Sequence, residues 1–164
     1  MQVVQSGQQA PPFSLPTTNG QPVSLSEALS KGPVVAAFFK ISCPVCQFTF
    51  PFLERLHRAY GGRGATLLGV SQDDAELTRE FSAEYGITFA CVTDEDGYPV
   101  SNQYGLTNVP TIYLVAPDGK VLLQSVGFVK DDLQRISTEL AVRLKQQAAP
   151  LFLPDEIIPD YKPG

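Results

Sequence analysis

Two of the three cysteines in this chain of 164 residues stand three positions apart, at Cys43 and Cys46. They follow an apolar run, residues 33–39, and open a stretch of helical periodicity over residues 44–60. A sulfur at the start of a helix faces free backbone amides and the positive end of the helix dipole, which favour its ionised form. Cys46 lies one turn later on the same side and can close a disulfide. The pair therefore predicts a nucleophilic thiol and a resolving thiol in one preformed turn.

The surrounding pattern indicates which elements position the pair. Residues 33–39 are a short, β-branched and aromatic run typical of a buried strand, and Pro44 suits the first helical position because its missing N–H has no intrahelical partner there. Strand patterns recur at 65–71, 87–93, 111–116 and 120–126, and helical patterns at 73–85, near 105 and at 131–147. Early alternation followed by a hairpin predicts an α/β fold with a central mixed β-sheet flanked by helices on both faces.

The sequence leaves three alternative roles open for the cysteine pair. A zinc site would need Cys43, Cys46, Cys91 and His57, the only histidine, although no second closely spaced pair of ligands is present. An inert disulfide would close too small a loop to stabilise much, and two buried thiols could be neighbours by chance. Cys91, in an apolar strand pattern, is expected to be a buried structural thiol, and His57 a surface or helix-packing residue.

A second feature is the step Val109-Pro110-Thr111 immediately before the predicted hairpin. A proline that opens a strand removes a ladder donor, and X–Pro is where cis peptide bonds occur. About 64 residues after a Cys-x-x-Cys pair in an alternating α/β pattern, this step becomes a strong signal.

These motifs together resemble the thioredoxin superfamily over roughly residues 8–147. Pro51, seven residues after Pro44, lies where thioredoxin-like proteins kink this helix, and residues 117–119 form a Pro-Asp-Gly hairpin turn. The N-terminal part resembles the extension of the TlpA/ResA and AhpC/TSA branches. Residues that match this pattern are Ala10, Pro11, Phe13, Leu15, Gly20, Val23, Leu25 and Gly32.

The resemblance implies roles for particular residues. Cys43 would attack a substrate disulfide, and Cys46 would resolve the mixed disulfide. Pro110 would be cis and packed against the pair, and the Val109 backbone would pair with an extended substrate segment. Pro44, Val45 and Thr111 would complete the substrate-binding surface. No metal, organic cofactor or other prosthetic group is implied.

The sequence departs from the thioredoxin pattern in three features. The dipeptide between the cysteines is Pro-Val, Ser42 replaces the usual tryptophan, and Ala37 stands where thioredoxin carries a buried aspartate. Two alternatives therefore accompany the interpretation as a thiol–disulfide oxidoreductase. One is a peroxiredoxin-like peroxidase, although the Pro-x-x-x-Thr/Ser-x-x-Cys loop is not found at either cysteine. The other is a non-catalytic thioredoxin-fold binding module.

The amino-acid composition limits the classes of binding partner that we expect. Hydrophobic residues make up 43% of the chain, the net charge is −5, and no basic run occurs. A surface for nucleic acid or anionic membrane is therefore not expected. We expect disulfide-containing protein substrates, an unidentified electron donor, and a monomer or homodimer. The start lacks a signal-peptide pattern, which predicts a cytoplasmic protein as written, or a periplasmic or exported one if a leader has been removed.

The domain prediction places a thioredoxin-like domain at residues 1–147, with an N-terminal extension of about 1–32, and a proline-rich apolar tail at 148–164. Prolines at four positions of this tail forbid a regular helix, yet its leucine, isoleucine and phenylalanine side chains favour burial. We expect the tail to fold back along the domain or to dock on a second subunit.

Overall fold

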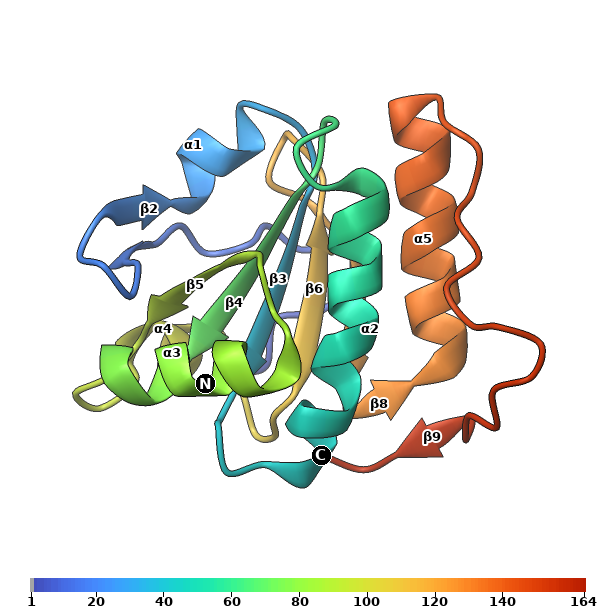
Figure 1. Cartoon of the computed structure of the whole chain (residues 1–164). Coiled ribbons are helices and arrows are strands. Elements are labelled where there is room, and N and C mark those ends of the chain that lie inside the picture. Colours follow the sequence, from blue (N-terminus) through green and yellow to red (C-terminus); the bar gives the residue numbers. More distant parts are fainter. Residues whose placement is uncertain (1) are drawn as a thin grey trace.

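The computed structural model describes residues 2–164, in which a five-stranded sheet is sandwiched between helices (Figure 1). The strands are β1 (Ser14–Pro16), β2 (Pro22–Ser24), β3 (Val34–Phe39), β4 (Thr66–Ser71), β5 (Ala90–Thr93), β6 (Thr111–Val115), β7 (Val121–Val126), β8 (Phe128–Val129) and β9 (Tyr161–Lys162). The helices are α1 (Leu25–Leu29), α2 (Pro44–Tyr60), α3 (Ala75–Tyr85), α4 (Pro99–Gln103) and α5 (Lys130–Leu144). Among these residues no helix is long and apolar enough to cross a membrane.

The central sheet has the strand order β5-β4-β3-β6-β7. β3 runs parallel to β4 and antiparallel to β6, so the sheet is mixed, as the sequence predicts. All six residues of β3 are buried, because alternate side chains pack into two different cores. Val35, Ala37 and Phe39 face α2, α3 and α5, whereas the other three residues face α1, α4 and the N-terminal segment. The predicted α/β fold class is therefore confirmed.

The element bounds differ from the predicted ones by three residues at the start of β5 and at the end of α5, and by two residues or fewer at the other predicted strands and at α3. The strand expected over residues 87–93 begins only at Ala90, because the Thr88 N–H donates to the Glu54 carboxylate (2.8 Å) instead of to a neighbouring strand. The helix expected over 131–147 ends at Leu144. There Lys145 adopts the left-handed conformation (φ 54°), and the Gln146 N–H caps the carbonyl of Ala141 (2.9 Å).

Helix α2 starts and ends where the sequence predicts. Cys43 is its N-cap, Pro44 occupies the first turn, and the helix continues through Pro51 to Tyr60. Phe50 is fully buried and Phe52 nearly so, whereas Phe48 is only half-buried. The helix therefore turns most of its aromatic side chains into the core and leaves Phe48 near the surface beside its N-terminal end.

The tail folds back along the domain, as expected. Leu151 is buried, and the Phe152 ring lies 5.0 Å from that of Phe52 on α2. Beyond these contacts the chain returns to the end of the sheet where α2 begins, and it forms the short ribbon β8-β9 (Figure 1). The tail thus links the far end of the molecule to the surroundings of the cysteine pair.

Candidate active site

The two thiols of the Cys43–Cys46 pair have different surroundings. The Cys43 sulfur, at the N-cap of α2, accepts a hydrogen bond from the backbone N–H of Cys46 (3.2 Å) and is partly exposed. Cys46 is completely buried. Burial, together with the hydrogen bond to Cys43, raises the pKa of the Cys46 thiol well above its ordinary value. One sulfur of the pair is therefore accessible from the surface, and the other is buried next to it.

The Val109-Pro110 step lies next to the cysteine pair, because it precedes β6, the strand that pairs with β3. The Cys43 thiol is 3.5 Å from the Val109 carbonyl oxygen, to which it donates. The peptide bond between Val109 and Pro110 is cis, as the resemblance implies. The Val109 N–H donates to no other residue in the described part of the chain, 2–164. Thr111, buried at the start of β6, directs its hydroxyl to the carbonyl of Asn108 (2.7 Å) and so stabilises the turn rather than facing the open site.

The other two residues predicted to bind substrate, Pro44 and Val45, lie between the two cysteines in the first turn of α2. Pro44 is exposed, and Val45 is partly buried against the core, with its carbonyl accepting from the Thr49 hydroxyl (2.6 Å). Val109 also lines a small hollow of about 170 Å³, together with Lys40, Gln72 and residues 106–108. Polar and apolar residues therefore line the surface next to Val109.

Two residues that the sequence analysis did not single out hold the turn before the cysteines. The Asp73 carboxylate accepts from the Ile41 N–H (2.8 Å), and the Gln47 side-chain amide donates to the Ile41 carbonyl (2.8 Å). Asp73 lies two residues after the end of β4, whose carboxyl end lies beside that of β3. The sequence could have identified Asp73 by this position, because the strand before Asp73 is parallel and adjacent to the strand before Cys43.

Position 37 carries no proton-transfer group. Ala37, at the centre of β3, is buried in the core that also contains Cys46. Any proton that leaves Cys46 must therefore pass to water or to a group outside this strand.

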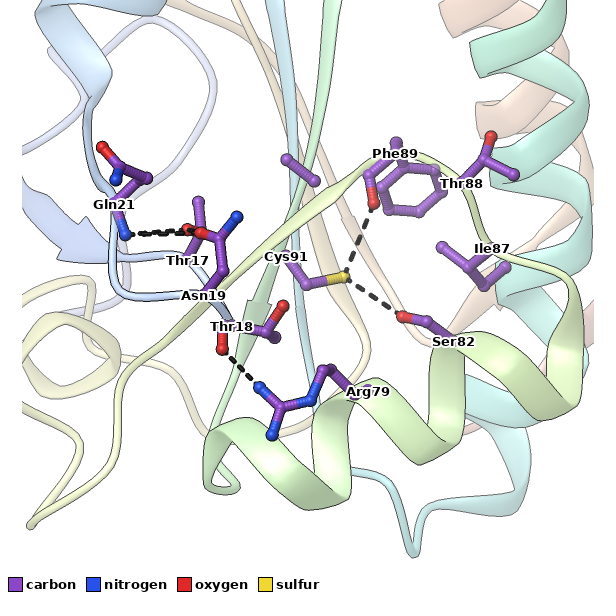
Figure 2. Close-up of a pocket in the computed structure, with 11 residues that line it drawn as sticks. Thr17, Thr18, Asn19, Gln21, Arg79, Ser82, Ile87, Thr88, Phe89 and Cys91 are labelled. Carbon is purple, nitrogen blue, oxygen red and sulfur yellow. Dashed lines mark hydrogen bonds between the residues drawn. The ribbon is translucent and has the colours of Figure 1, made fainter.

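Cys91 and His57 lie away from this site. Cys91, nearly buried on β5, lines a separate cavity of about 520 Å³ between the turn at residues 17–21 and α3 (Figure 2). Burial raises the pKa of Cys91 to about 11. The His57 ring packs edge-on against Phe89 at 5.8 Å. Within residues 2–164 no cluster of three or more His, Cys, Asp and Glu side chains could hold a metal, so the three cysteines and His57 do not form a zinc site.

The AhpC/TSA family model matches residues 6–124, which include the cysteine pair and the Val109-Pro110 step. The chain belongs to the AhpC/TSA family. Within this family it is 30% identical to the thiol-disulfide oxidoreductase ResA of Halalkalibacterium halodurans, over 84% of this chain and 78% of that protein. It is 28% identical to ResA of Bacillus subtilis, over 79% and 72% of the two chains.

Solved structures of family relatives have the same architecture. The thioredoxin domain of a thiol-disulfide oxidoreductase from Bacteroides vulgatus superposes with a TM-score of 0.74, at 26% identity, over 83% of this chain and 97% of that one. The resemblance to TlpA/ResA-like, thioredoxin-fold members of the AhpC/TSA family is therefore confirmed. With its paired thiols, the chain is a thiol–disulfide oxidoreductase.

Proposed function

We propose that this AhpC/TSA family member reduces or exchanges disulfides in protein substrates by the successive action of Cys43 and Cys46. The observation that carries the proposal is the N–H···S hydrogen bond between the two residues at the helix start (3.2 Å), with one sulfur partly exposed and the other buried. Cys43 is the accessible sulfur of the pair, and the thiolate is the nucleophilic form of cysteine, so we assign Cys43 as the attacking group.

The proposed reaction has two displacement steps. The Cys43 thiolate attacks one sulfur of the substrate disulfide, a Cys43–substrate bond forms, and the other substrate sulfur leaves as a thiolate that takes up a proton. Cys46 then gives up its proton and attacks the Cys43 sulfur, which releases the second substrate thiol and leaves a Cys43–Cys46 disulfide. Two electrons pass to the substrate, and an external dithiol must return them to the pair.

The surroundings of Cys46 separate these two steps. Because burial disfavours its charged form, Cys46 remains protonated while Cys43 is free, and it does not compete for the substrate. Once Cys43 is in the mixed disulfide, Cys46 lies directly beneath the bond that it must break. The Val109 carbonyl and N–H border this position, where an extended substrate segment can pair with the backbone.

Trapping the mixed disulfide tests this mechanism. Cys46→Ser removes the resolving thiol. Incubation of this variant with native, disulfide-bonded insulin is therefore expected to give a stable mixed disulfide on Cys43, which mass spectrometry detects. Cys43→Ser should give no adduct, and Cys91→Ser serves as the control that behaves like the parent chain.

Turnover distinguishes the proposal from its alternatives. With dithiothreitol as reductant, the parent chain is expected to accelerate insulin reduction over the reductant alone. Equal rates would contradict the proposal and favour a binding module, and rapid consumption of hydrogen peroxide without insulin reduction would favour a peroxidase.

A further inference from the structure

The last residues of the tail lie across the mouth of the active site. β9 pairs antiparallel with β8, with Lys162 opposite Phe128 and Tyr161 opposite Val129. The Lys130 N–H donates to the Asp160 carbonyl (2.9 Å), which extends the ribbon by one bond. The tail therefore arrives at the site as an extended strand, the conformation that the proposed function requires of a substrate segment.

The tail backbone packs closely on the backbone next to Pro110. Gly127 donates its N–H to the Pro110 carbonyl (2.8 Å) and leaves no room for a side chain. A Cβ added to Gly127 would lie only 2.6 Å from the Lys162 carbonyl oxygen and 3.1 Å from the Gly164 nitrogen. A Cβ on Gly164 would overlap the carbonyl oxygen of Val109. That carbonyl also accepts from the Cys43 thiol, so tail and nucleophile meet at one atom.

A side-chain contact holds the same segment. The Lys162 ammonium lies over the ring of Phe48, 4.8 Å from its centroid. Phe48 is the half-buried aromatic residue near the start of α2, and it is supported by the Phe128 ring at 4.9 Å. An extended segment is thus held by a cation on an aromatic face and by close backbone contact at Val109.

The tail is fixed more firmly upstream than at its last residues. The Arg55 guanidinium binds both carboxylate oxygens of Glu156 (2.7 and 2.6 Å), and Leu151 is buried. Between this anchor and β9, Ile157 is 99% exposed. β9 itself has only two residues, so residues 161–164 can leave the site while the upstream anchor stays in place.

We propose that residues 161–164 are an internal competitor that occupies the substrate-binding surface between Val109 and Phe48 and must be displaced by an incoming protein disulfide. This inference rests on the proposed function and names the segment that regulates it. The tail contacts also describe the preferred occupant, which is an extended segment with a basic side chain over Phe48 and a small residue at Val109.

Lys162→Ala in the chain of residues 1–164 tests the competitor role, with Lys31→Ala, an exposed lysine just after α1, as the matched control. Loss of the cation–π contact should lower the KM for insulin by about two- to fivefold and leave kcat unchanged. A small disulfide that does not need the surface between Val109 and Phe48 should react at the same rate with all three chains. The peptide of residues 160–164, Asp-Tyr-Lys-Pro-Gly, should inhibit insulin reduction competitively and bind Lys162→Ala more tightly than the parent chain.

A chain ending at Asp160 provides a second variant, with its melting temperature as the check on folding. If the tail covers this surface about nine-tenths of the time, its removal lowers the apparent KM about tenfold. An unchanged or higher KM in both variants, or a peptide without effect, would overturn the competitor role while insulin reduction by the parent chain still upheld the proposed function. If no chain reduced any disulfide, the proposed function would be wrong and the competitor role would fall with it.

Discussion

Three thiols in one small domain are given different properties by their surroundings. Cys43 is partly exposed and receives an N–H at a helix start, Cys46 is buried beneath it, and Cys91 is buried on another strand. Burial raises the pKa of both Cys46 and Cys91, and only an ionised sulfur is a good nucleophile. Reactivity in this protein is therefore decided by position in the fold and not by the number of cysteines.

Alkylation should separate the three thiols. In the reduced native protein at neutral pH, iodoacetamide is expected to label Cys43 and to leave Cys46 and Cys91 unmodified. With a pKa of about 11, Cys91 is ionised in on the order of one molecule in a thousand or fewer near neutral pH. Mass spectrometry of digested peptides measures each site, and labelling in guanidinium chloride provides the control in which all three react. Labelling of Cys91 as fast as Cys43 in the native protein would contradict this assignment.

At the scale of elements, β4 and β5 fit together through one unusual strand residue. Gly69 lies in the middle of β4, where glycine is normally unfavourable. A Cβ at this position would lie 2.7 Å from the Cys91 sulfur and 3.1 Å from the Phe39 ring. The absence of a side chain at Gly69 therefore makes room for Cys91, which acts as a packing residue between β4 and α3.

Substitution of this pair should reveal the packing constraint. Gly69→Ala overfills the core and should lower the free energy of unfolding by about 1–3 kcal/mol. Cys91→Ala removes the atom with which the new methyl group collides, so the double variant should lose less stability than the sum of the single variants. Urea unfolding under reducing conditions gives the free energy of unfolding of the parent chain, the two single variants and the double variant. We expect a coupling energy of about 1 kcal/mol between the two substitutions. Strict additivity would show that the two residues do not share the space.

At the scale of the whole molecule, the tail fastens α2 to the remainder of the chain. The Arg55 guanidinium contacts the Glu156 carboxylate and the Leu151 carbonyl (2.8 Å), and it lies over the Phe52 ring. Its hydrogen bonds lower the pKa of Glu156 from an ordinary 4.5 to about 2. The stabilisation from this ion pair is therefore present above pH 4.5 and is lost as the pH falls toward 2.

Glu156→Gln should remove that pH dependence. Above pH 5 the variant is expected to melt at a lower temperature than the parent chain, and the difference should shrink as the pH falls from 4.5 to about 2. Scanning calorimetry at several pH values measures it. Glu139→Gln, which breaks the exposed pair with Arg143, is the control for loss of a surface charge. A constant difference between pH 5 and pH 2 would show that the ion pair does not hold the tail.

The local structure around the cysteine pair can be predicted from the amino-acid sequence alone. The buried strand before the pair, the bounds of α2 and the placement of Cys43 at its N-cap all follow from residues that are neighbours in the chain. Strand periodicity and the proline at the helix start act over a few residues, so they can be read without the fold. The α/β class follows in the same way from the alternation of such patterns.

The residues that surround the pair in space come together only through the arrangement of the strands and the tail. Val109 reaches the Cys43 sulfur because β6 lies beside β3, and Asp73 holds the preceding turn because β4 lies on the other side. The path of residues 161–164 across the active site depends on contacts with α2, β8 and the Pro110 turn together. Such contacts join residues far apart in the chain, and their geometry is fixed by strand order and close packing, which no local pattern encodes.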